Sequence, residues 1–325
     1  MIAPYLARLL CLSFATFFLV YMAVSLGSFA AAPAMVRLAK RMRSQVAARL
    51  VLGLRLAPLG VALFVVLGLC LPSYLLLEPR TSTEEIGYAC LAAALVGAIA
   101  WTISIWRALR AVAVSLRDMR RCRGLGRRLD VPGQSLPVDV IEGEAPLLAL
   151  AGVFRPRIVI SRAIVRALTP EQLDAALGHE RAHWASRDNL KRFLLLLAPD
   201  PFPFCSGLRR IDRSWAKFTE WAADDQAVAG DAERSVTLAS ALVRVARLGT
   251  PARRAPLMAT LVPADDELSI RVDRLLSPEP LREESRRLRM VVGGALAVGT
   301  TLLVALILQP ATMYSVHQLL EHLVH

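Results

Sequence analysis

The chain has 325 residues, of which 55% are hydrophobic and 20% are charged, and its mean hydropathy is +0.47. Soluble domains are about 45–50% apolar and about 25% charged, so this composition excludes a purely soluble or disordered chain and indicates membrane-spanning segments. The net charge of +12 fits either nucleic-acid binding or basic cytoplasmic loops, and the positions of the charges decide between them.

Four stretches between charged residues are apolar over the roughly 20 residues that a spanning helix needs. They lie at 9–36, 56–77, 86–106 and 290–308. A fifth apolar patch, 193–198, is too short to cross and suits a segment that lies in the interface or packs under the other helices. The sequence therefore predicts a mainly α, polytopic membrane protein with four transmembrane helices.

The Lys and Arg residues in the short loops predict the orientation of these helices. The loop at 33–57 is basic and contains no acid, and the segment 107–128 contains many arginines against the single acid Asp118. Both are expected in the cytoplasm, with the N-terminus outside. The expected organisation is then 1–106 with three transmembrane helices, 107–289 as a cytoplasmic domain, 290–310 as a fourth transmembrane helix and 311–325 as a short extracytoplasmic tail.

Two features of this topology have competing interpretations. Small residues at 28–32 could be the cleavage site of a signal peptide, but the apolar stretch exceeds the usual 7–15 residues or so, and cleavage would leave the basic loop outside. The arginine-rich run 117–128 could contact nucleic acid, but its place just after a span favours the anionic headgroups of the bilayer. We therefore expect a retained first span and no direct contact with nucleic acid.

The 107–289 segment begins with strand signals and continues into a helix. Two short apolar runs, 138–141 and 157–160, are separated by glycines and a proline, which predicts two or three strands with the second run at an edge. Thr169, Pro170 and Gln172 form a capping signature, which predicts a helix from Pro170 to about Ala185.

This helix contains the pattern His179-Glu180-Arg181-Ala182-His183. Residues four apart share one helical face, so both imidazoles can bind one zinc ion, and the intervening Glu180 is placed to act as general base. The alternative is a solvated, charged helix face. A catalytic zinc site also needs a third protein ligand, and an acidic residue further along the chain can supply it.

Glu220 is the candidate third ligand, in a stretch at 208–229 that we expect to be helical. Asp224 lies four residues further on and shares its face, so it can accept the outer N–H of a ligand histidine and fix the orientation of that ring. Taken alone, Glu220 would be interpreted as an ordinary surface carboxylate.

The string from His179 to Leu190, followed by an apolar stretch to Phe204 and by Glu220-Trp221-Ala222-Ala223-Asp224, resembles the BlaR/MecR family of integral membrane zinc metallopeptidases. The resemblance covers residues 1–310 and is most specific in 169–228. It implies a protein of the bacterial inner membrane that has a cytoplasmic α+β, zincin-like domain. In this domain His179, His183 and Glu220 would be the Zn²⁺ ligands, and Glu180 would be the general base. Only about 15 residues follow the fourth span, so the extracellular penicillin-binding sensor domain of those receptors is not expected.

An oxyanion-stabilising side chain is harder to assign. Residues 107–289 contain no tyrosine, and their only histidines are the two expected ligands. Arg271 is the candidate for contact with the oxyanion or the substrate, because a similar Arg-apolar segment follows the third ligand in HtpX-type membrane peptidases. The alternative is a salt-bridging arginine.

The sequence thus predicts a zinc endopeptidase that cleaves a protein or peptide at the cytoplasmic face, with the extended substrate pairing beside 157–161. The resemblance implies regulatory cleavage of a transcriptional repressor or of the chain itself. The alternatives are an HtpX-type quality-control peptidase and a non-catalytic membrane signalling scaffold, and the intact Glu180 argues against the scaffold.

Overall fold

The computed structural model describes residues 2–78, 87–129, 137–142, 145–200, 206–249, 259–260 and 267–277, together with 309, 314, 315 and 318. Apart from these last positions, the expected fourth transmembrane helix at 290–310 and the expected tail at 311–325 lie outside the described residues.

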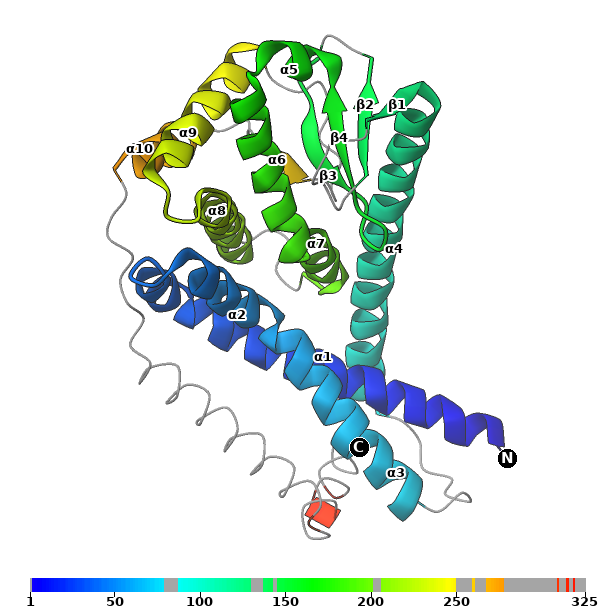
Figure 1. Ribbon diagram of the computed structural model, residues 1–325. Helices are drawn as coiled ribbons and strands as arrows, with labels where there is room; N and C mark the ends of the chain where they lie inside the picture. The colour runs from blue at the N-terminus through cyan, green and yellow to red at the C-terminus, as the bar shows by residue number, and fades with distance from the viewer. Residues whose placement is uncertain are drawn as a thin grey trace.

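Long apolar helices form one end of the molecule (Figure 1). They are α1 (Ile2–Ala39), α2 (Ser44–Val65), which continues through the π-helical turn η1 (Val66–Cys70) into α3 (Leu71–Leu77), and α4 (Tyr88–Leu125). Three segments, Tyr5–Ala39, Ser44–Leu77 and Tyr88–Arg120, are long and apolar enough to cross a membrane. They correspond to the first three predicted spans.

Helix α4 joins the membrane helices to the rest of the protein. It packs against α1 at Gly97, where a Cβ atom would come within 2.8 Å of the carbonyl oxygen of Phe14, so a larger residue would push the two helices apart. Beyond its apolar part α4 runs on without a break to the sheet (Figure 1). The domain boundary expected at residue 106 therefore falls inside one continuous helix.

The sheet is small and mixed, with the strand order β1-β2-β4-β3-β5. Its strands are β1 (Gly126–Leu129), β2 (Val138–Ile141), β3 (Leu148–Ala151), β4 (Arg157–Ser161) and β5 (Ala259–Thr260). Strand β4 pairs in parallel with β2 and antiparallel with β3. The prediction that 157–161 lies at an edge was therefore wrong, because both sides of this strand are already paired.

Helices cover this sheet and connect it to the membrane end. They are α5 (Arg162–Ala167), α6 (Pro170–Ala185), α7 (Asp188–Leu197), α8 (Ser206–Val228), α9 (Ala232–Arg247) and α10 (Glu267–Leu276). Helix α6 begins at Pro170 as predicted, with the Thr169 hydroxyl accepting from Gln172 N–H and the Gln172 side chain accepting from Thr169 N–H. Its buried residues, such as Leu177, join a core shared with the sheet and α9.

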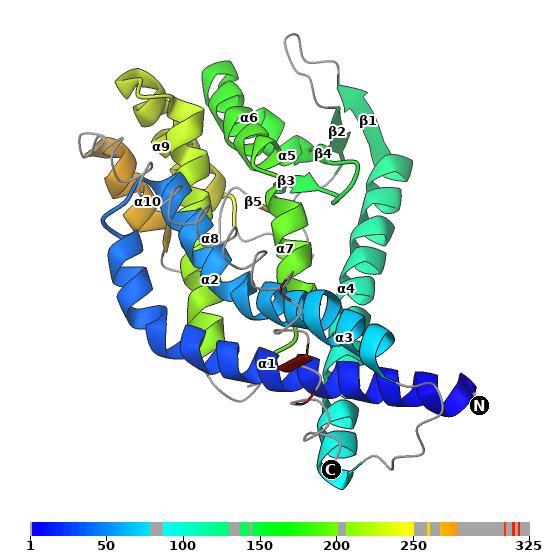
Figure 2. The same cartoon turned by 90° about the horizontal axis from the view of Figure 1, so that it is seen from below.

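A second apolar core joins the membrane helices to α8. It contains Val51 on α2 and Ile211 and Trp215 on α8, all of them buried. The Arg55 side chain of α2 is 3% exposed and pairs with Asp212 of α8 at 3.0 Å. Helix α8 packs against both α2 and α6, so the helix that carries Glu220 links the membrane helices to the helix that carries the two histidines (Figures 1 and 2).

Candidate metal centre

Three side chains of the motif lie in the interior, on helix α6. His179, Glu180 and His183 are each 0% exposed. The two histidines are one helical turn apart, and their Nε2 atoms lie 3.1 Å from each other. Among the described residues, neither carboxylate oxygen of Glu180 has a hydrogen bond of ordinary geometry. This burial excludes the solvated helix face that the sequence left as an alternative.

Glu220 reaches the same point from α8. Its Oε2 atom is 3.4 Å from His179 Nε2, and its Oε1 atom is 3.6 Å from His183 Nε2. One donor atom from each of the three residues lies within 4.8 Å of the others. Zinc bonds of about 2.0–2.1 Å in a tetrahedral arrangement place ligand atoms about 3.3 Å apart, and two imidazoles with one carboxylate are a common catalytic set. The three residues therefore fit a Zn²⁺ ion.

A buried carboxylate lies next to the outer nitrogen of each histidine. His179 Nδ1 is 2.9 Å from Asp224 Oδ1, and His183 Nδ1 is 2.8 Å from Asp188 Oδ2. Such contacts select the tautomer that leaves Nε2 for the metal and hold the ring in place. Asp224 lies beside a ligand histidine, as its spacing from Glu220 suggested.

Asp188 is a partner that the sequence analysis missed. It reaches His183 because Arg187, at φ 54°, adopts the left-handed conformation and turns the chain sharply between α6 and α7. The Asp188 carboxylate also binds Lys191 Nζ at 2.7 Å. The only local signal in the sequence was an acidic residue at the start of a helix, five residues after the second histidine. Acidic residues are common in the first turn of exposed helices, so this signal is not specific.

Two arginines lie against the carboxylates of the centre. Arg271 on α10 is 1% exposed, and its Nε and Nη2 atoms donate to the two oxygens of Asp224 at 2.9 and 2.7 Å. Its Nη1 atom is 3.3 Å from Glu220 Oε2. Arg192 on α7, which the sequence analysis did not select, lies 3.6 Å from Glu220 Oε1. The contacts of Arg271 fit the salt-bridging alternative, and its contact with an oxyanion stays a prediction.

Burial and neighbouring charges shift the pKa values of the motif. Burial raises the pKa of Glu180 to about 7, although the two nearby histidines act in the opposite direction. Burial alone would lower the pKa of His183, but the carboxylates of Glu220 and Asp188 outweigh it and raise this pKa to about 10. The surrounding carboxylates thus favour positive charge next to the imidazoles, whether it is carried by a proton or by a metal cation that replaces it.

The acids of the centre stay ionised in spite of their burial. Burial raises the pKa of Asp224, but Arg271 and His179 lower it further, and the result is about 2. The pKa of Glu220 lies well below its ordinary value, because His183, His179 and Arg271 outweigh its burial. Both groups are therefore carboxylates at neutral pH, as a metal ligand and a hydrogen-bond acceptor must be.

Comparison with known proteins assigns this region to a peptidase family. Residues 117–253, from the end of α4 to just past α9, match Peptidase family M48. The matched segment contains all three residues of the His-His-Glu cluster. No curated protein matches the chain. With this match, the buried ligand set and three helices of membrane-spanning length, the protein is a membrane zinc metallopeptidase whose residues 117–253 are similar to Peptidase family M48.

Proposed function

We propose that this peptidase is an endopeptidase that cleaves protein or peptide substrates at the cytoplasmic face of the bacterial inner membrane, in a regulatory role. The observation that carries the catalytic part is the burial of Glu180 between two histidines that meet Glu220. A scaffold without turnover would not need a carboxylate at that position. The cytoplasmic placement follows from the basic loop at 33–57 and the basic run after residue 107.

Different residues of the site bind the metal, transfer the proton and orient the ligand histidines. His179, His183 and Glu220 would hold the zinc ion, which lowers the pKa of water to about 7 and polarises a carbonyl group. The Glu180 carboxylate accepts the proton of the attacking water and delivers it to the nitrogen of the leaving amine. Asp188 and Asp224 hold the two imidazoles at their outer nitrogens.

Arg271 acts in this proposal as a positioning residue. Its guanidinium group joins Asp224 to Glu220, so it fixes a metal ligand relative to the carboxylate that holds His179. Planar bidentate pairing gives a more rigid link than a lysine ammonium group could.

The substrate cannot add as a strand beside β4, because both of its edges are paired. The outer edge of β3 is also in use: β5 pairs with Ala149 and Leu150, and Asn189 donates to the carbonyl oxygens of Leu150 and Gly152, both at 2.9 Å. We therefore propose that recognition depends on a side-chain pocket next to the turn that bears Asp188. Phe154, 76% exposed, and Trp184, 40% exposed, line this pocket.

The pocket suits an apolar substrate side chain next to the cleaved bond. Replacing Phe154 with Ala should raise KM for peptides with a large apolar residue there by about tenfold, which is the usual cost of a lost apolar contact, and should leave kcat nearly unchanged. Peptides with alanine at that position serve as the matched comparison. An equal loss for both peptide sets would contradict the assignment.

The regulatory role rests on the resemblance to BlaR/MecR peptidases, which implies cleavage of a transcriptional repressor or of the chain itself. An HtpX-type quality-control role uses the same chemistry on different substrates. Quantitative proteomics of cells that express either the wild type or the Glu180→Gln variant separates the two. Accumulation of one or a few regulators in the variant supports regulation, and broad accumulation of membrane proteins supports quality control.

The orientation has a separate test in reporter fusions. Fusions at Arg80 and Arg128 should report the outside and the cytoplasm, respectively. The reverse result would place the metal centre on the other side of the membrane and would contradict the cytoplasmic assignment.

A further inference from the structure

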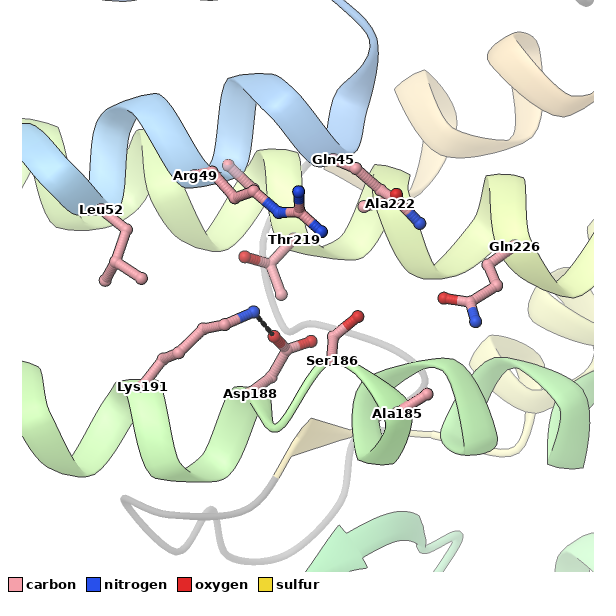
Figure 3. Close-up of a pocket in the computed structure, with 11 residues that line it drawn as sticks. Gln45, Arg49, Leu52, Ala185, Ser186, Asp188, Lys191, Thr219, Ala222 and Gln226 are labelled. Atoms are coloured by element: carbon pink, nitrogen blue, oxygen red, sulfur yellow. Dashed lines mark hydrogen bonds and ion pairs between the residues drawn. The ribbon is translucent and has the colours of Figure 1, made fainter. Parts of the chain in front are cut away.

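A cavity of about 340 Å³ lies between α2, the α6–α7 turn and α8 (Figure 3). This volume is within the range of about 300–1,000 Å³ that small-molecule sites occupy. Its polar lining includes Gln45 and Arg49 from α2, Ser186 and Lys191 from the α6–α7 region, and Thr219 and Gln226 from α8. The cavity therefore lies where the membrane helices meet the helices of the metal centre.

Two donor groups on this lining point into the cavity and have no partner in the part of the chain that the structure describes. Arg49 and Thr219 extend toward Ser186 and Lys191 on the opposite wall (Figure 3). Thr219 is 3% exposed, and among the described residues its hydroxyl oxygen has no hydrogen-bond partner. Arg49 forms no ion pair with any residue that the structure describes. A buried hydroxyl without a partner normally marks a missing ligand or water.

The charges around the cavity favour an anion. Arg49 and Lys191 each contribute a positive charge, and Asp188 is the one acid among the lining residues that the structure describes. Both oxygens of Asp188 are already in use, one by Lys191 at 2.7 Å and the other by His183 at 2.8 Å. The cavity therefore offers cationic and hydroxyl donors with an unused positive charge.

We propose that this cavity binds a phosphate group through Arg49, Lys191 and Thr219. The group can belong to an anionic lipid or to a soluble phosphate compound, since both present the same oxygens. Arg49 lies one turn inside the start of Ser44–Leu77, the second segment of membrane-spanning length. Headgroup phosphates lie near the ends of membrane-spanning helices, and arginine and lysine bind them through charge-assisted hydrogen bonds.

A bound phosphate would also be in contact with the metal centre through one side chain. Lys191 binds Asp188, which in turn holds His183 Nδ1. A phosphate that accepts a hydrogen bond from Lys191 competes with Asp188 for the ammonium group of this lysine. The competition changes the contact between Asp188 and His183, which orients the ligand histidine. Occupancy of the cavity would therefore alter zinc affinity or turnover. This regulatory part rests on the proposed function, whereas the binding site itself does not.

Binding is tested on the full-length, zinc-loaded protein carrying Glu180→Gln, so that peptidase turnover does not enter the measurement. The thermal unfolding midpoint is followed against inorganic phosphate in neutral phosphatidylcholine nanodiscs, and separately in nanodiscs of increasing phosphatidylglycerol content. A saturable rise with phosphate identifies a soluble ligand, and a rise only with phosphatidylglycerol identifies a lipid headgroup. No rise with either probe would overturn the proposal.

Substitutions test whether the rise in the unfolding midpoint comes from binding in this cavity. Arg49→Gln and Thr219→Val should each weaken binding, Arg49→Gln by about tenfold or more because it removes a charge-assisted hydrogen bond. Arg41→Gln removes the same charge from the same basic segment, 33–57, without touching the cavity and should leave binding unchanged. Equal weakening by Arg41→Gln and Arg49→Gln would indicate general attraction to the surface and would also overturn the proposal.

Discussion

Replacing Asp188 with Asn removes one charge from the interior while keeping the size and shape of the side chain. Asp188 is 2% exposed and lies 2.8 Å from His183 Nδ1 and 2.7 Å from Lys191 Nζ. The neutral amide can still contact the imidazole, but it no longer favours the orientation and the basicity that a metal ligand needs. The structure therefore predicts weaker zinc binding with the fold retained.

The size of the effect follows from these contacts. Loss of a buried carboxylate partner of a ligand histidine typically costs about 10–100-fold in metal affinity, or about 1.4–2.7 kcal/mol. Solvent cannot replace the lost charge, because the carboxylate is almost completely buried. Asp174→Asn on the preceding helix, α6, is the matched control. Its carboxylate is 55% exposed and pairs with Arg234 at 2.9 Å, a contact worth about 0–1 kcal/mol.

Zinc affinity is measured by competition with a chelating dye on the purified full-length protein, and circular dichroism checks the fold. Asp188→Asn should release zinc to the dye at about 10–100-fold lower competitor concentration than the wild type, and Asp174→Asn should match the wild type. Identical zinc affinity in Asp188→Asn and the wild type would refute the reasoning, as would an equal loss in both variants.

Other predictions concern stability and the metal. Arg271→Gln should lower the free energy of unfolding by about 3–5 kcal/mol, measured by chemical denaturation in detergent, because it leaves the Asp224 carboxylate buried without its partner. Arg55→Met should cost less, about 1–3 kcal/mol, since Asp212 is 39% exposed and water can solvate it; a larger loss than for Arg271→Gln would contradict this ranking. Zinc chelation should abolish cleavage and lower the unfolding midpoint, and added Zn²⁺ should restore both; cleavage that survives chelation would contradict a zinc mechanism.

Local signals in the sequence were enough for the motif helix. The Thr169–Gln172 capping box depends only on neighbouring residues, and the four-residue spacing of His179 and His183 already places both rings on one face. The long apolar stretches likewise predicted the first three membrane segments from composition alone.

Contacts between distant elements were less predictable. Arg271 meets Asp224 across 47 positions in sequence, and nothing in its neighbourhood distinguishes a buried salt bridge from a substrate contact. Asp188 reaches His183 because Arg187 adopts the left-handed conformation. Glycine or asparagine at this position would have predicted that conformation from the sequence, but an arginine does not. The central position of β4 did have a signal: Ile158, Val159 and Ile160 form a continuous apolar run, which is typical of a strand buried on both faces.

The most direct test of the account compares the wild type with Glu180→Gln, both zinc-loaded and reconstituted into lipid vesicles. Bound zinc and the rate of cleavage of a peptide substrate are measured in the same samples. The account predicts that the variant retains its zinc, because Glu180 is not a ligand, and loses about 10²–10⁴-fold in cleavage rate, because the proton acceptor is gone. Unchanged cleavage by the Glu180→Gln variant, or a wild-type protein that binds no zinc, would contradict it.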